Sequence, residues 1–182
     1  MSNKGFIGLG VMGSAMARHI STKYSHLVVF NRTMDKANSW VKVNGGQAVS
    51  NAAEVGELCE QVFLCVGNDQ DVKELVSGEE GILQTMKKGG VIVDHSTISA
   101  DMSKELSELC SSKEIGFIDA PVSGGQAGAE SGQLTVMAGG EEKYFDMVKD
   151  TIACYSKFLK LMGPSGSGQL TKMVNQICIA GL

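Results

Sequence analysis

The chain has 182 residues, of which 43% are hydrophobic and 20% charged, so it holds enough apolar material for one domain with a core and is not expected to be disordered. Its net charge of −4 comes without a block of Lys or Arg, which argues against nucleic acid as a partner. No apolar run approaches the roughly 20 residues of a membrane span, and the first residues lack a secretory pattern. We expect no membrane association and a cytoplasmic location, with an organellar one left open.

The five cysteines are odd in number, widely spaced and free of the C-x-x-C pattern. Each lies in an apolar stretch, which predicts reduced thiols in the core and no metal site. They are Cys59, Cys65, Cys110, Cys154 and Cys178. Glycine is unusually frequent, with 23 residues, which indicates tight turns and close backbone approaches of the kind that serve a ligand.

Short apolar runs alternate with segments of helical period, which predicts an α/β fold. The predicted strands are residues 5–9, 27–31, 47–49, 62–66, 91–94, 116–119, 134–138 and 158–162, and the predicted helices are 11–23, 33–44, 51–59, 69–76, 99–113 and 141–152. Most of the strands are apolar throughout, so we expect a doubly wound, mostly parallel sheet with helices on both faces. Residues 1–162 would form this domain.

The sequence pattern changes at Gly163, where a turn-rich stretch precedes an apolar segment that runs to Leu182 without a polar ending. A helix that stopped there would expose apolar surface. We therefore interpret residues 163–182 as a linker and the first part of a longer helix whose packing partners are absent.

A G-x-G-x-x-G motif directly follows the first predicted strand and directly precedes a helix. Its residues are Gly8, Leu9, Gly10, Val11, Met12 and Gly13. The first glycine permits the turn, the second lets backbone approach a pyrophosphate, and the third allows close packing of helix on strand. The motif in this setting predicts dinucleotide binding, with a merely structural turn as the alternative.

The second strand ends in Asn31, Arg32 and Thr33, where an acidic residue would bind the ribose 2′-hydroxyl of NAD. No acid is present, and a guanidinium can pair with a phosphate in bidentate geometry. The sequence therefore favours NADP over NAD. The alternative is a solvated arginine beside a Thr33 that only caps the next helix.

Two further loops follow the fourth and fifth strands, at the sheet edge where such folds bind ligands. Val66, Asn68 and Thr97 lie there and could contact ribose and nicotinamide, whereas simple helix capping by Asp69 and Ser99 is the alternative. His95 lies in the same region, and we do not assign it as an acid or base because no orienting partner is evident. We expect it to be polar surface.

Ser123, Gly124 and Gly125 follow the sixth strand. Such a turn can aim consecutive backbone N–H groups and a hydroxyl at one anion, which suits a carboxylate. An ordinary flexible loop is the alternative.

On a helix that begins near Gly168, Lys172 and Asn175 share a face close to its positive end. A lysine that acts as acid and base must have a pKa lowered from about 10.4 toward neutrality, which burial and the helix N-terminus both favour. From the residues alone, a surface lysine remains the alternative.

These motifs, in this order and spacing, resemble the β-hydroxyacid dehydrogenases, a family that includes 3-hydroxyisobutyrate dehydrogenase, tartronate semialdehyde reductase, glyoxylate and succinic semialdehyde reductases and, more distantly, 6-phosphogluconate dehydrogenase. The resemblance implies a Rossmann-type domain followed by an all-α domain, joined by the helix that carries Lys172. It implies that Lys172 is the general acid/base and that Asn175 holds the substrate oxygen. Ser123 and Gly124 would bind the substrate carboxylate, and Asn68 and Thr97 the coenzyme.

The chain departs from the family pattern in three ways. Gln176 stands where many members have a second Asn, and Gly67 where many have Pro. The second domain, which supplies most of the dimer contact in the family, is absent after Leu182, so a homo-oligomer is expected only with that domain present. The leading hypothesis is an NADP-dependent oxidoreductase of a small 3-hydroxy acid or its semialdehyde; the alternative is a non-catalytic dinucleotide-binding module.

Overall fold

The computed structural model describes residues 3–181. The strands are β1 (Lys4–Ile7), β2 (Val28–Phe30), β3 (Gln47–Ala48), β4 (Gln61–Leu64), β5 (Val91–Asp94), β6 (Gly116–Asp119), β7 (Val122–Ser123), β8 (Leu134–Gly139) and β9 (Ser156–Gly163). The helices are α1 (Val11–Lys23), α2 (Met34–Asn44), α3 (Ala52–Leu58), α4 (Asp69–Ser77), the 3-10 turn η1 (Ile82–Gln84), α5 (Ala100–Ser112), α6 (Gly125–Glu130), α7 (Glu142–Ile152) and α8 (Ser167–Ala180).

The strands form one sheet in the order β3-β2-β1-β4-β5-β6-β8-β7, and the first six are mutually parallel. This arrangement confirms the predicted doubly wound, mostly parallel sheet. The chain reverses its direction of growth between β1 and β4, and ligands of such sheets bind beyond the carboxyl ends of the strands at this point. At the far end, β8 runs antiparallel to β6 and pairs with β9 in parallel.

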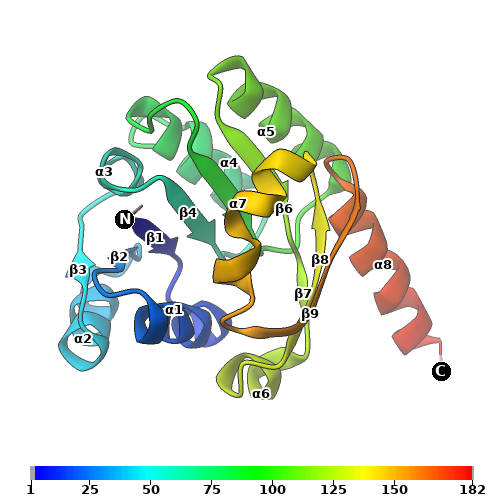
Figure 1. Cartoon of the computed structure of the whole chain (residues 1–182), viewed down its shortest axis with the longest axis horizontal. Helices are drawn as coiled ribbons and strands as arrows, with labels where there is room; N and C mark the ends of the chain where they lie inside the picture. The colour runs from blue at the N-terminus through cyan, green and yellow to red at the C-terminus, as the bar shows by residue number, and fades with distance from the viewer. Residues whose placement is uncertain (1–2, 182) are drawn as a thin grey trace.

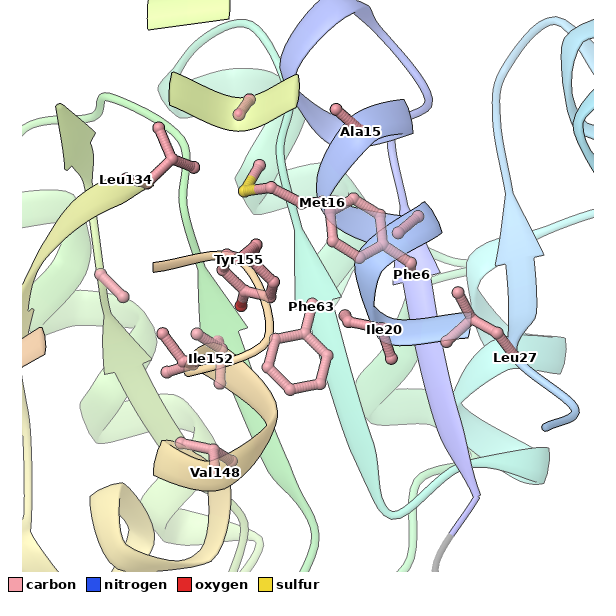
Figure 2. Close-up of a cluster of buried hydrophobic side chains, with 14 of the residues drawn as sticks. Phe6, Ala15, Met16, Ile20, Leu27, Phe63, Leu134, Val148, Ile152 and Tyr155 are labelled. Atoms are coloured by element: carbon pink, nitrogen blue, oxygen red, sulfur yellow. The ribbon is translucent and has the colours of Figure 1, made fainter. Parts of the chain in front are cut away.

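Successive strand residues pack on opposite faces of the sheet. Phe6 and Phe63 belong to one buried cluster, and their neighbours Ile7 and Leu64 belong to the other. Helices α1, α2 and α7 contribute to the first cluster and α3, α4 and α5 to the second. Figure 2 shows the first cluster, in which the side chain of Tyr155 lies among those of β4 and α1. Burial on both faces explains why the strands lack polar alternation.

Three elements were not predicted: β7, α6 and η1. Each is six residues or shorter, too short for a helical or strand period to appear in the sequence. The predicted cap at Asp69 is also wrong, because Asn68 caps α4 by accepting the N–H of Asp71. The predicted cap at Ser99 is confirmed, since its hydroxyl accepts the N–H of Met102.

Helix α8 lies at the β8 and β9 end of the sheet and runs away from it toward the C-terminus (Figure 1). Several large apolar side chains on its surface are exposed, namely Leu170, Met173, Val174, Ile177 and Ile179. Within residues 3–181, no helix is long and apolar enough to cross a membrane.

Candidate functional site

In the glycine turn after β1, each of the three glycines has a different structural reason to lack a side chain. Gly8 has a φ of 95°, in the left-handed region, and a Cβ at Gly13 would overlap the carbonyl oxygen of Gly8. Gly10 differs: a Cβ there would meet no described atom within 4 Å. Gly10 is also the N-cap of α1 and offers no side-chain cap, so the first amides of α1 are not covered from that side. The turn therefore fits a pyrophosphate, which could approach at Gly10.

The segment after β2 lies beside this turn. Asn31 accepts the N–H of Leu9 at 3.0 Å and donates to the carbonyl of Thr33 at 3.1 Å, so it ties the two loops together. Arg32 is 92% exposed, and Nη1 lies 3.8 Å from a carboxylate oxygen of Asp71. Thr33 is the N-cap residue of α2 but makes no side-chain cap. The guanidinium is thus exposed at this edge and held only by a long surface ion pair.

Most of the other sequence-predicted residues, with the exception of Asn68 and Asn175, meet in a cleft of about 420 Å³ at the carboxyl edge of the sheet. Its lining combines the start of α1, the loops after β4 and β5, the turn after β6 and one face of α8. The lining residues are Met12, Cys65, Val66, His95, Ser96, Thr97, Val122, Ser123, Gly124, Gly125, Lys172 and Gln176. Segments more than 150 residues apart in the chain therefore share one site.

Lys172 is the one lysine or arginine among the residues that line this cleft. Burial lowers its pKa below the ordinary value of 10.5. The other two titratable groups of the lining are neutral there, because burial raises the pKa of Cys65 to about 12 and lowers that of His95 to about 4. A partly desolvated amine in a cleft without a fixed charge is suited to proton transfer.

The two amide residues of α8 differ in position. Gln176, one turn after Lys172, lines the cleft, whereas Asn175 does not. The amide nitrogen of Asn175 is buried and has no hydrogen-bond partner among residues 3–181. A buried donor without a partner is costly, so this nitrogen is available to a group that reaches it.

The predicted residues of the loops after β4 and β5 differ in whether they line the cleft. Val66 and Thr97 line the cleft. Asn68 does not, and both ends of its amide are engaged with Asp71: the oxygen accepts the backbone N–H, and the nitrogen donates to the carboxylate. Asp69, the first residue of α4, accepts from both the N–H and the hydroxyl of Ser99 and so joins the loops after β4 and β5.

The prediction that His95 is polar surface is wrong. Its ring is buried, 2% exposed, and stacks on Phe63. Nδ1 lies 2.7 Å from the carbonyl oxygen of Ala120, which can only accept, so Nδ1 carries the proton and Nε2 accepts from the hydroxyl of Tyr155 at 2.7 Å. Both partners are distant in sequence, which is why no orienting group was evident.

Asp94, at the end of β5, is a second buried titratable group. It accepts the N–H of Ser96 through one oxygen, while the other has no partner in the described chain. Burial raises the pKa of Asp94 to about 7. Its contribution to the free energy of unfolding is therefore complete below pH 3.8 and is lost as the pH rises through about 7. His95 has the opposite sign: its contribution is complete above 6.5 and is lost as pH falls through about 4.

These opposing signs predict a difference between Asp94→Asn and the wild type. Acidification from pH 7 to pH 4 should lower the free energy of unfolding of Asp94→Asn by on the order of 3 kcal/mol more than that of the wild type, because the variant lacks the proton uptake that offsets His95. Urea unfolding at several pH values measures it. Parallel pH profiles for the two proteins would contradict the assignment of Asp94.

The reversal of the sheet at β1 and β4, with an open glycine turn beside it, defines a dinucleotide-binding domain. The chain belongs to the family of the NAD binding domain of 6-phosphogluconate dehydrogenase, whose model matches residues 3–166. The family resemblance read from the three motifs is thereby confirmed, as is the predicted fold class.

Three similar proteins illustrate the family. An uncharacterized oxidoreductase of Shewanella frigidimarina (strain NCIMB 400) is 50% identical over all of this chain and 62% of its own length. The mitochondrial 3-hydroxyisobutyrate dehydrogenase of Mus musculus is 36% identical over 97% of this chain and 52% of its own. The structure of 3-hydroxyisobutyrate dehydrogenase of Mycobacterium tuberculosis with L-serine has a TM-score of 0.92 and 26% identity, over 99% of this chain and 60% of that one. The chain thus spans between 52% and 62% of the length of these relatives.

Proposed function

We propose that the protein is an NADP-dependent oxidoreductase that transfers a hydride between the coenzyme and a small 3-hydroxy acid or its semialdehyde. The observation that carries the proposal is that Lys172 shares one cleft with the start of α1 and with the turn at residues 123–125. A bound nicotinamide would supply the hydride acceptor or donor. Oxidation of NADPH in the presence of a panel of semialdehydes and glyoxylate tests it.

The polar groups in and beside the cleft take separate roles in this proposal. Lys172 takes the hydroxyl proton during oxidation and returns it during reduction. Ser123, Gly124 and Gly125 bind the substrate carboxylate through backbone N–H groups and a hydroxyl. Asn175, whose amide nitrogen is unpartnered, and Gln176, which lines the cleft, are the amides available to the substrate oxygen. Val66 and Thr97 lie where the coenzyme would pass between the loops.

The preference for NADP rests on the segment after β2. Arg32 is exposed and paired only loosely with Asp71, so a phosphate dianion can replace that partner. Lys36, which the sequence analysis did not single out, lines a second cleft together with Leu9 of the glycine turn. Two cations in the segment that follows β2 favour the binding of a 2′-phosphate.

We predict that Arg32→Ala weakens NADPH binding by about 10- to 100-fold, the loss of a charge-assisted contact to phosphate, and leaves NADH binding within about twofold. Isothermal titration with both coenzymes measures this. Arg18→Ala is the matched control, because Arg18 instead donates to the carbonyl of Glu130. Equal binding of NADH and NADPH by the wild type, with Arg32→Ala neutral, would overturn the coenzyme assignment.

We further propose that residues 1–162 form the coenzyme domain and that residues 163–182 are a linker and the first part of the helix that leads into an all-α domain. The exposed apolar side chains of α8 support this division. A homo-oligomer is expected where that domain is present. All five cysteines are free thiols, but Cys178 is exposed, so the prediction of a core position is wrong for that residue. A cytoplasmic location is proposed because a reducing compartment maintains free thiols.

A further inference from the structure

Helix α8 begins on a buried carboxylate of the sheet. Asp119, the last residue of β6, accepts the N–H of Gly166 at 2.7 Å through one oxygen and that of Gln169 at 3.0 Å through the other. Gly168 packs so closely on this residue that a Cβ would lie 2.8 Å from its carbonyl oxygen. The carboxylate satisfies two of the free N–H groups at the helix start and is placed at the positive end of the helix dipole.

The side chain of Gln169 then connects α8 to a different loop. It is 4% exposed; its Nε2 donates to the carbonyl of Ser96 at 2.8 Å, and its Oε1 accepts the N–H of Ile98 at 3.3 Å. These two groups flank Thr97, which lines the cleft. One amide therefore fixes both sides of the residue that the coenzyme would contact.

Ser96 extends the connection to the loop after β4. Its hydroxyl accepts the N–H of Val66 at 2.9 Å, and its own N–H donates to Asp94. Val66 also lines the cleft. The loops after β4 and β5 and helix α8 are thus held in one buried hydrogen-bond network, and Lys172 lies one helical turn beyond Gln169.

We propose that Gln169 is a positioning residue that sets Lys172 against the coenzyme-binding loop at residues 96–98. The inference rests on the proposed role of Lys172 as acid/base and adds the element that fixes its place. Gln169 does not line the cleft and acts through α8 and the loop. Because misplacement of a reacting group by about 1 Å can cost about 100-fold in rate, a buried link between the two partners of proton and hydride transfer has a direct effect on turnover.

Gln169→Met tests the proposal because it removes both amide hydrogen bonds and nearly preserves side-chain length. Gln84→Met is the control: it makes the same replacement in η1 and removes one amide bond to the carbonyl of Gly78, at a residue that does not line the cleft. Hydrogen exchange at the amide of Ile98 and the NMR titration of Lys172, assigned by its absence in Lys172→Ala, are measured in both proteins without coenzyme. Turnover is measured alongside.

In Gln169→Met we expect exchange at Ile98 to accelerate about fivefold. The pKa of Lys172 should rise toward its ordinary value, since the amine becomes more exposed when α8 is no longer tied to the loop at residues 96–98. The kcat should fall about tenfold with KM within about threefold. Gln84→Met should change none of these. Gln169→Asn, whose amide is too short to reach both partners, should behave like Gln169→Met, and it replaces that variant if Gln169→Met does not fold.

A folded Gln169 variant with an unchanged Lys172 titration would overturn the inference, even if exchange at Ile98 accelerates, because Gln169 would then hold the loop alone. Failure of the proposed function looks different: Lys172→Ala would keep wild-type turnover, whereas the titration of Lys172 would still report whether Gln169 sets its environment.

Discussion

Lys172→Ala is expected to lower the rate of NADPH-dependent semialdehyde reduction by about 100- to 10,000-fold, the range that one positioned acid or base contributes. Burial lowers the pKa of this amine, so a larger share is neutral near physiological pH than for a surface lysine. Oxidation needs the neutral amine, and its rate should rise with pH through the pKa of Lys172. Reduction needs the ammonium form and should show the opposite slope.

The measurement is coenzyme oxidation followed by absorbance, with NADPH affinity determined separately. Lys160→Ala serves as the control because Lys160 is an exposed lysine of β9. Equal rates for wild type and Lys172→Ala would remove Lys172 from the reaction. Tight NADPH binding without turnover on any substrate of the panel, in the wild type, would favour a non-catalytic dinucleotide-binding module.

Replacement of two glycines of the first turn by alanine should affect different properties, namely stability at Gly13 and coenzyme binding at Gly10. Gly13→Ala should lower the free energy of unfolding by about 3 kcal/mol or more, because the new methyl group overlaps the backbone of Gly8. Gly10→Ala should lower the free energy of unfolding by no more than about 1 kcal/mol, because the free protein has room for the methyl group and only the weaker N-cap is felt. It should nevertheless weaken coenzyme binding at least tenfold by blocking the approach of the pyrophosphate.

Thermal unfolding and coenzyme titration of both variants separate these effects. Gly89→Ala is a reference for coenzyme binding, because a Cβ at Gly89 also meets no described atom within 4 Å. Its stability is not compared with that of Gly10→Ala, since the φ of 83° at Gly89 strains any other residue. Undiminished NADPH binding by Gly10→Ala would contradict the placement of the pyrophosphate at this turn, whatever the behaviour of Gly13→Ala.

The sheet was predictable because its determinants are local. Uninterrupted apolar runs signalled strands buried on both faces, and the glycine spacing after β1 signalled the turn and the helix that follows it. The grouping of Lys172 with residues 123–125 could also be anticipated, because each lies at a position the family motifs mark. Whether these residues perform the proposed roles stays a prediction.

Other features depend on contacts that no local pattern encodes. His95 is buried because Tyr155, 60 residues away, supplies a hydroxyl to its ring. Asn68 and Asp69 are both good caps, and only the fold decides that Asn68 caps α4 while Asp69 reaches Ser99. The helical phase that brings Gln176 into the cleft likewise follows from where α8 begins, which the buried carboxylate of Asp119 determines.

Strand β9 is eight residues long, and within the described chain it pairs with β8 alone. It exposes Phe158 and Met162, a combination that invites a second molecule to add its own strand and start aggregation. Lys157 and Lys160 stand exposed on the same strand, and their like charges make such stacking of copies unfavourable. The two lysines thereby oppose aggregation through β9, and the effect should be largest at high protein concentration.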